Sequence, residues 1–168
     1  MSIRGALAIA AVSTVGDFIW ATWIPHHRPA YGLIHGTLLF LAIGLFLGVV
    51  ARRPTAGAVG AGLIGALGTV GFYLIAPLVG FSAMFVMWVA IWIGLGVLVG
   101  RLMPGTAGLR ADLARGVIAA VVSGAAFYAI SGIWRPFNPQ GWDYAMHFGA
   151  WTIAYLPGFA ALLVKRRA

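Results

Sequence analysis

Apolar stretches of about 20 residues recur along this chain of 168 residues, and the charged residues lie in bands between them. A helix of that length spans the core of a bilayer, which is about 30 Å thick. Only 8% of the residues are charged, whereas roughly 25% is usual in a soluble protein. Together with the mean hydropathy of +0.98, this pattern predicts an integral membrane protein.

Six apolar stretches predict six membrane-spanning helices. Because the connections between them are short, we expect an all-α, polytopic membrane protein, a six-transmembrane-helix bundle of three antiparallel hairpins. No polar linker divides the chain, so residues 1–168 are expected to form a single transmembrane domain. The expected spans cover residues 3–24, 31–51, 56–79, 81–103, 113–134 and 144–164.

The basic residues predict the orientation of these spans. With six spans, nine of the eleven basic residues fall on one side of the membrane, and only Arg28 and Arg135 fall on the other. The positive-inside rule then places both termini in the cytoplasm, and we expect a multi-pass protein of the bacterial inner (cytoplasmic) membrane with the lipids as partners. Because the basic residues border apolar spans, no nucleic-acid partner is expected.

Several kinds of chemistry are not indicated by this sequence. The chain has no cysteine, which excludes disulfides, iron–sulfur clusters and cysteine nucleophiles. No serine lies in a G-x-S-x-G motif, and no glycine-rich phosphate loop carries a lysine. Whether the protein is an enzyme therefore stays open at this stage.

Small residues recur at four-residue spacing on three expected helices. Such spacing lets helix backbones approach closely in lipid. We interpret these faces as packing surfaces inside the bundle. The alternatives are chance, since 24 of the residues are glycine, and contact with a homo-oligomer or a partner membrane subunit. The three series are Gly44 and Gly48; Gly57, Ala61 and Gly65; and Gly96 and Gly100.

Polar and aromatic residues gather at the expected non-cytoplasmic end. All four histidines lie there, whereas Asp112 is expected to be solvated in a cytoplasmic loop. At 1.5 Å per residue, Asp17 should lie ~10 Å inside its span, and His35 and His147 ~6 Å inside theirs. Ionisable groups at such depths usually face a bundle interior or a watery cavity, so these three residues are functional candidates.

Helical spacing favours a shared cavity among the first, second, fifth and sixth spans, because each of three spans carries a polar and aromatic stripe. Aromatic walls with a few converging polar groups are typical of small-molecule sites. The stripes are Ser13, Asp17 and Trp20; Ser123, Phe127, Ser131 and Trp134; and His147, Trp151 and Tyr155. The predicted ligand-binding residues are Asp17, Trp20, His35, Ser131, Trp134, Asp143, His147 and Trp151.

Four functions fit these residues. The first is binding or transport of a small solute or ion through this site. The second is a metal-dependent membrane enzyme or carrier using zinc, iron or copper, and the third is haem ligation by His35 and His147. The fourth is a structural or assembly subunit whose glycine-rich faces contact a partner. Asp17 itself has the alternative of a purely structural pair with an imidazole, such as that of His35 or His147. The predicted metal ligands are His26, His27, His35, Asp143 and His147.

In size, helix number and expected topology the chain resembles the solute-capturing membrane subunits of energy-coupling-factor vitamin transporters. The local match is Ala6-x-x-x-Ala10 on the first span. In that family this spacing docks the coupling partner. The resemblance implies solute capture from the outer side and a partner subunit at Ala6 and Ala10.

Overall fold

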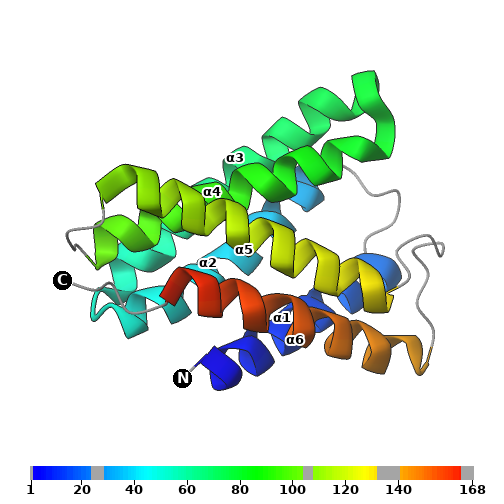
Figure 1. Cartoon of the computed structure of the whole chain (residues 1–168). Coiled ribbons are helices and arrows are strands. Elements are labelled where there is room, and N and C mark those ends of the chain that lie inside the picture. The colour runs from blue at the N-terminus through cyan, green and yellow to red at the C-terminus, as the bar shows by residue number, and fades with distance from the viewer. Residues whose placement is uncertain (1, 24–28, 104–107, 132–140, 164–168) are drawn as a thin grey trace.

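The computed structural model describes residues 2–23, 29–103, 108–131 and 141–163, which form six α-helices and one short 3-10 helix. The all-α prediction is confirmed, and each expected span coincides with one helix (Figure 1). Two helices begin at a proline, a residue that suits the first helical turn. The elements are α1 (Ser2–Trp23), α2 (Pro29–Val50), α3 (Pro54–Val79), η2 (Gly80–Ser82), α4 (Ala83–Leu102), α5 (Gly108–Ser131) and α6 (Asp143–Leu163).

The outer surface of the bundle is apolar. Within the described residues, four helices, α2, α3, α4 and α6, are long and apolar enough to cross a membrane. Large aliphatic side chains cover their outward faces; on α3, Leu67 is 71% exposed and Leu78 is 82% exposed. A soluble monomer rarely exposes contiguous apolar surface of this kind. By their length and composition, these helices support the prediction of a membrane protein.

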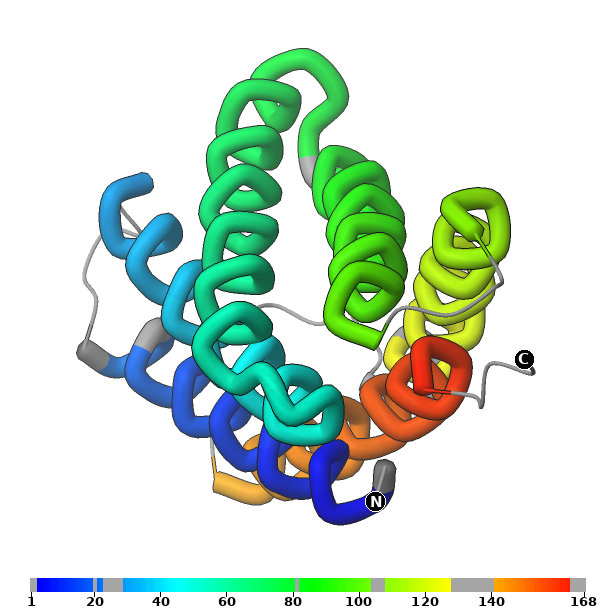
Figure 2. Tube along the Cα trace, turned by 90° about the vertical axis from the view of Figure 1, so that its left-hand side faces the viewer, coloured from blue at the N-terminus to red at the C-terminus, as the bar shows by residue number. Residues whose placement is uncertain are grey.

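The helices follow one another around a ring. Each helix contacts its neighbour in the chain, and α6 closes the ring by packing against α1 (Figure 2). The contact between α1 and α2 is the least extensive of the six. The ring brings the first and last helices together, and it leaves its weakest seam beside α1.

Glycines form the seam between α2 and α3. A methyl group on Gly44 would collide with the carbonyl oxygen of Gly57, and one on Gly57 would collide with the backbone of Gly48. Further along the same seam, Gly36 contacts Thr69. The small-residue series on these two helices therefore face each other inside the chain, as close packing in lipid requires.

The series on α4 contacts α5, and one expectation fails there. A methyl group on Gly96 would collide with the backbone of Gly116, and one on Gly100 would collide with the Asp112 carboxylate.

Asp112 was expected to be solvated in a loop, and this is wrong, since the residue lies in α5 and is only 8% exposed. The reason is that α5 begins at Gly108, and Gly100 leaves room for the carboxylate, which lies 3.9 Å from Nη1 of Arg115.

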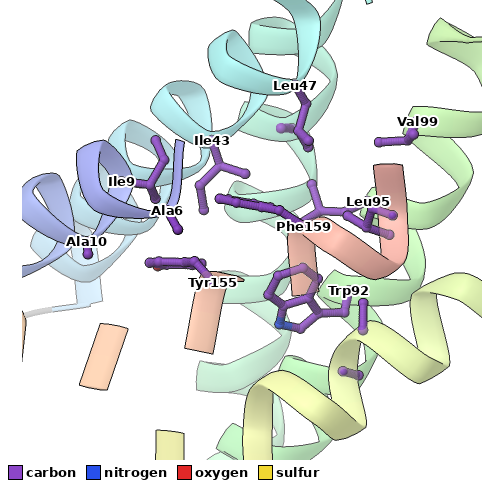
Figure 3. Close-up of a cluster of buried hydrophobic side chains, with 14 residues drawn as sticks. Ala6, Ile9, Ala10, Ile43, Leu47, Trp92, Leu95, Val99, Tyr155 and Phe159 are labelled. Carbon is purple, nitrogen blue, oxygen red and sulfur yellow. The ribbon is translucent and has the colours of Figure 1, made fainter. Parts of the chain in front are cut away.

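The apolar core lies toward the start of α1 and the ends of α2, α4 and α6. Phe159 is fully buried between Leu47 of α2 and Leu95 of α4 (Figure 3). Ala6 and Ala10 are also fully buried, in the same cluster and beside Tyr155. Their four-residue spacing therefore serves packing within this chain and presents no free docking face.

Candidate functional site

Asp17 of α1 contacts two side chains of α6, beside a second and smaller apolar cluster of Phe127, Ala150 and Ala154 that packs against Trp151. Its Oδ2 atom lies 3.2 Å from Nδ1 of His147 and accepts a hydrogen bond of 2.8 Å from Nε1 of Trp151. The side chains of Asp17 and His147 are 25% and 27% exposed. We call these three residues the Asp17 cluster.

The two carboxylate oxygens of Asp17 differ in their surroundings. Both hydrogen bonds described above engage Oδ2. Within the described part of the chain, Oδ1 has no hydrogen-bond partner. A carboxylate can accept about four hydrogen bonds through its two oxygens. The hydrogen bonds to Oδ2 therefore orient the carboxylate, and Oδ1 can still accept hydrogen bonds from a ligand.

The cluster is the end of a longer polar contact between α1 and α6. Deeper in the bundle, the Tyr155 hydroxyl lies 2.9 Å from Oγ of Ser13. Since the Ser13 hydroxyl proton is engaged by the carbonyl oxygen of Ile9, at 2.9 Å, Tyr155 is the donor to Ser13. The stripes predicted on the first and sixth spans thus meet face to face.

Aromatic rings fix the position of Trp151. Its indole is stacked on Tyr155, with ring centroids 5.4 Å apart, and lies 4.4 Å from the Phe127 ring of α5. Trp88 of α4 is stacked on it at 6.3 Å and donates a hydrogen bond to the carbonyl oxygen of Ala120. Because three aromatic rings pack around the indole, Trp151 acts on Asp17 as an oriented N–H donor.

Sequence reasoning missed Trp88, because no site residue was expected on α4. A signal was available in the spacing of Trp88 and Trp92, which lie four residues apart on a largely aliphatic helix and whose rings are 5.9 Å apart. Residues four apart lie on the same face of a helix, so both indoles are expected to pack against the same neighbouring helices. Trp92 is only 3% exposed.

His35 of α2 lies against the backbone of α1. A methyl group on Gly16 would collide with the imidazole of His35, so the glycine makes room for the ring. Beside this contact, a groove of about 260 Å³ runs between α1 and α2. Its α2 wall holds Tyr31 and His35 among aliphatic side chains, and we call it the α1–α2 groove.

The remaining predicted site residues are placed only in part. Asp143 is the first residue of α6 and lies one turn before His147, on the same face. Trp20 lies within α1 and Ser131 ends α5, but their side chains are outside the described structure. Trp134, His26 and His27 lie outside the described residues altogether. The prediction that they join the site therefore stays untested.

The described residues do not form a metal centre. Across residues 2–23, 29–103, 108–131 and 141–163, no three His, Cys, Asp or Glu side chains are arranged to hold a metal ion. Of the predicted ligands, His35, Asp143 and His147 fall in these ranges. Because His26 and His27 lie outside these ranges, the predicted metal site stays untested, and so does haem ligation by His35 and His147.

Comparison of the chain with protein-family models, with curated proteins and with solved structures gives no match.

Proposed function

We propose that the protein binds or transports a small polar solute or cation at the Asp17 cluster. The main support is the difference between the two carboxylate oxygens of Asp17. Oδ2 is hydrogen-bonded by His147 and Trp151, whereas Oδ1 has no hydrogen-bond partner within the described residues. Placing an aspartate inside a membrane costs roughly 2.5–3.5 kcal/mol, so such residues usually serve a function. A solute that donates a hydrogen bond or carries positive charge would complete the coordination of Asp17.

We further propose that the six helices cross the bacterial inner membrane as three antiparallel hairpins, with both termini in the cytoplasm. The register of the contacts supports this arrangement, since Gly36 meets Thr69 whereas Gly44 meets Gly57 farther along α2. Arg52 and Arg53 lie at the turn between α2 and α3, at the opposite end of the bundle from the Asp17 cluster. The positive-inside rule then assigns the cluster to the non-cytoplasmic half.

A binding screen on the purified protein tests the proposed function. The panel contains primary and quaternary amines, vitamins and metal ions, and the readout is the thermal unfolding temperature in detergent together with equilibrium binding. We expect one class of solute to raise the unfolding temperature of the native protein. The Asp17→Asn variant should lose this response, because the amide keeps the shape and removes the charge.

The matched control is Thr152→Val on α6. The Thr152 hydroxyl donates only to the carbonyl oxygen of Phe148 in its own helix, at 2.8 Å. This variant should keep the response of the native protein. A flat profile across the whole panel, or an equal response in native protein and Asp17→Asn, would refute the proposal.

A further inference from the structure

The α1–α2 groove is separate from the Asp17 cluster. Its α1 wall consists of Val12, Val15, Gly16 and Ile19. At 100° per residue, these positions centre about 130° around the helix from Ser13 and Asp17, which face α6. A molecule in this groove would therefore touch a different side of α1 from a solute at Asp17.

The groove opens outward, toward the side that lipid would cover. Apolar residues on both of its walls are well exposed: Val15 by 56%, Ile34 by 55% and Leu38 by 60%. Since the seam between α1 and α2 is the least extensive in the ring, a molecule dissolved in the membrane can reach the groove sideways.

The polar groups of the groove lie together on α2. Tyr31 and His35 are four residues apart and line the same groove. A phenol and an imidazole can each donate and accept hydrogen bonds, and no Asp, Glu, Lys or Arg is among the described lining residues. The described lining thus suits a neutral head group with hydrogen-bonding atoms.

The size of the groove limits the head group. Pockets for drug-sized ligands usually measure about 300–1,000 Å³, and this groove, at about 260 Å³, is just below that range. It is large enough for one ring. An attached chain would extend along the exposed aliphatic residues into the lipid.

We propose that the α1–α2 groove binds a neutral, membrane-dissolved amphiphile whose head is a single hydrogen-bonding ring, such as an alkylated benzoquinone. The ring lies beside Tyr31 and His35, and the chain follows Ile34 and Leu38 outward. The space that Gly16 leaves lets the imidazole of His35, which lines the groove, lie against α1.

The test is equilibrium binding of decyl-benzoquinone to the full chain in lipid nanodiscs. Decylbenzene, which has the chain and a ring but no carbonyl groups, is the comparison probe. The quinone should bind saturably and more tightly than decylbenzene. His35→Leu should weaken quinone binding by about three- to tenfold, the value of one or two hydrogen bonds, and leave decylbenzene unaffected.

A second pair of variants keeps the test independent of folding defects. Leu38→Trp fills the groove from an exposed position and should weaken quinone binding by about tenfold or more. Leu45→Trp makes the same change on the same helix, at a residue that is 49% exposed and does not line the groove. It should bind the quinone as the native protein does.

The outcomes separate this inference from the proposed function. Equal quinone affinity in Leu38→Trp and Leu45→Trp, or equal affinity for the two probes, would show an ordinary lipid contact and overturn the inference. Asp17→Asn should weaken quinone binding less than Leu38→Trp does, because Asp17 hydrogen-bonds to α6 and does not line the groove. Loss of quinone binding in Asp17→Asn alone would overturn the assignment of two separate sites.

Discussion

At the scale of single residues, Asp17 shows how a bundle accommodates a carboxylate within an apolar helix. Trp151 supplies an N–H held in place by three aromatic neighbours, and His147 supplies a ring nitrogen from one turn away. Each donor also needs Asp17, because an indole N–H without an acceptor is costly in an apolar environment. The contact is therefore stabilising in both directions.

Replacing Asp17 should expose this mutual dependence. We expect Asp17→Ala to lower the free energy of unfolding by about 1–3 kcal/mol, since Trp151 and His147 both lose their acceptor. Asp17→Asn should cost less, because its amide oxygen can still accept from Trp151. Reversible unfolding in mixed micelles measures the difference, with Thr152→Val as the control. Equal stability of Asp17→Ala and that control would contradict the contact.

At the scale of helices, close packing in this bundle depends on glycine, which has no Cβ atom and so lets neighbouring helices approach. Between α2 and α3 the neighbours of Gly44 are backbone atoms and Ala61, which cannot turn aside as a long side chain can. Between α3 and α4, in contrast, Gly60 faces the flexible end of Leu98. The two seams should therefore respond differently to the same small substitution.

A single methyl group tests the first seam. Gly44→Ala should force α2 and α3 apart and lower the free energy of unfolding by about 1–3 kcal/mol, the usual cost of overpacking. The control is Gly149→Ala on α6, because no atom lies within 4 Å of a methyl group at that position. Unfolding by a denaturing detergent gives both values. A Gly44→Ala protein as stable as Gly149→Ala would exclude backbone contact at this seam.

The α1–α6 contact can be measured with a double-mutant cycle. Ser13→Ala and Tyr155→Phe each remove one partner of the buried 2.9 Å hydrogen bond. Interhelical hydrogen bonds in membrane proteins contribute about 0.6 kcal/mol on average and up to about 1.7 kcal/mol. We expect a coupling energy in that range from the unfolding of the four proteins. A coupling of zero would mean that the hydroxyl groups do not interact.

At the scale of the whole molecule, the two ends of the bundle differ in kind. One end holds the dense core around Phe159 and Leu95, together with the turn that carries Arg52 and Arg53. The other end holds the Asp17 cluster and the opening between α1 and α2. This asymmetry suits the proposed binding of a solute at the end that holds the Asp17 cluster.

The proposed orientation can be tested directly, since the native chain contains no cysteine. Ser82→Cys and Thr55→Cys both introduce thiols at exposed positions, at opposite ends of the bundle. A membrane-impermeant maleimide added to intact cells should label Ser82→Cys and should label Thr55→Cys only after permeabilisation. The reverse result would invert the topology and would place the Asp17 cluster on the cytoplasmic side.

The sequence predicted several residues of the candidate site, but it did not predict which of them contact one another. Asp17, His147 and Trp151 stand out in the sequence because polar groups at such depth in apolar helices are costly. His35 is expected at the same depth as His147, yet the sequence of α2 does not reveal which neighbour the imidazole faces, and the structure places it at the α1–α2 groove. Trp88 was missed because no site residue was expected on the fourth span.

The sequence by itself determined the number, length and type of the helices, because apolar runs of bilayer length leave no alternative to backbone hydrogen bonding within each segment. It also determined which residues share a face of each helix. Only the tertiary structure decided which faces meet. The ring joins Asp17 to His147 across a separation of 130 residues, and no local pattern encodes such a contact. The burial of Asp112 was likewise decided by a helix start at Gly108 and by space that Gly100 leaves on a different helix.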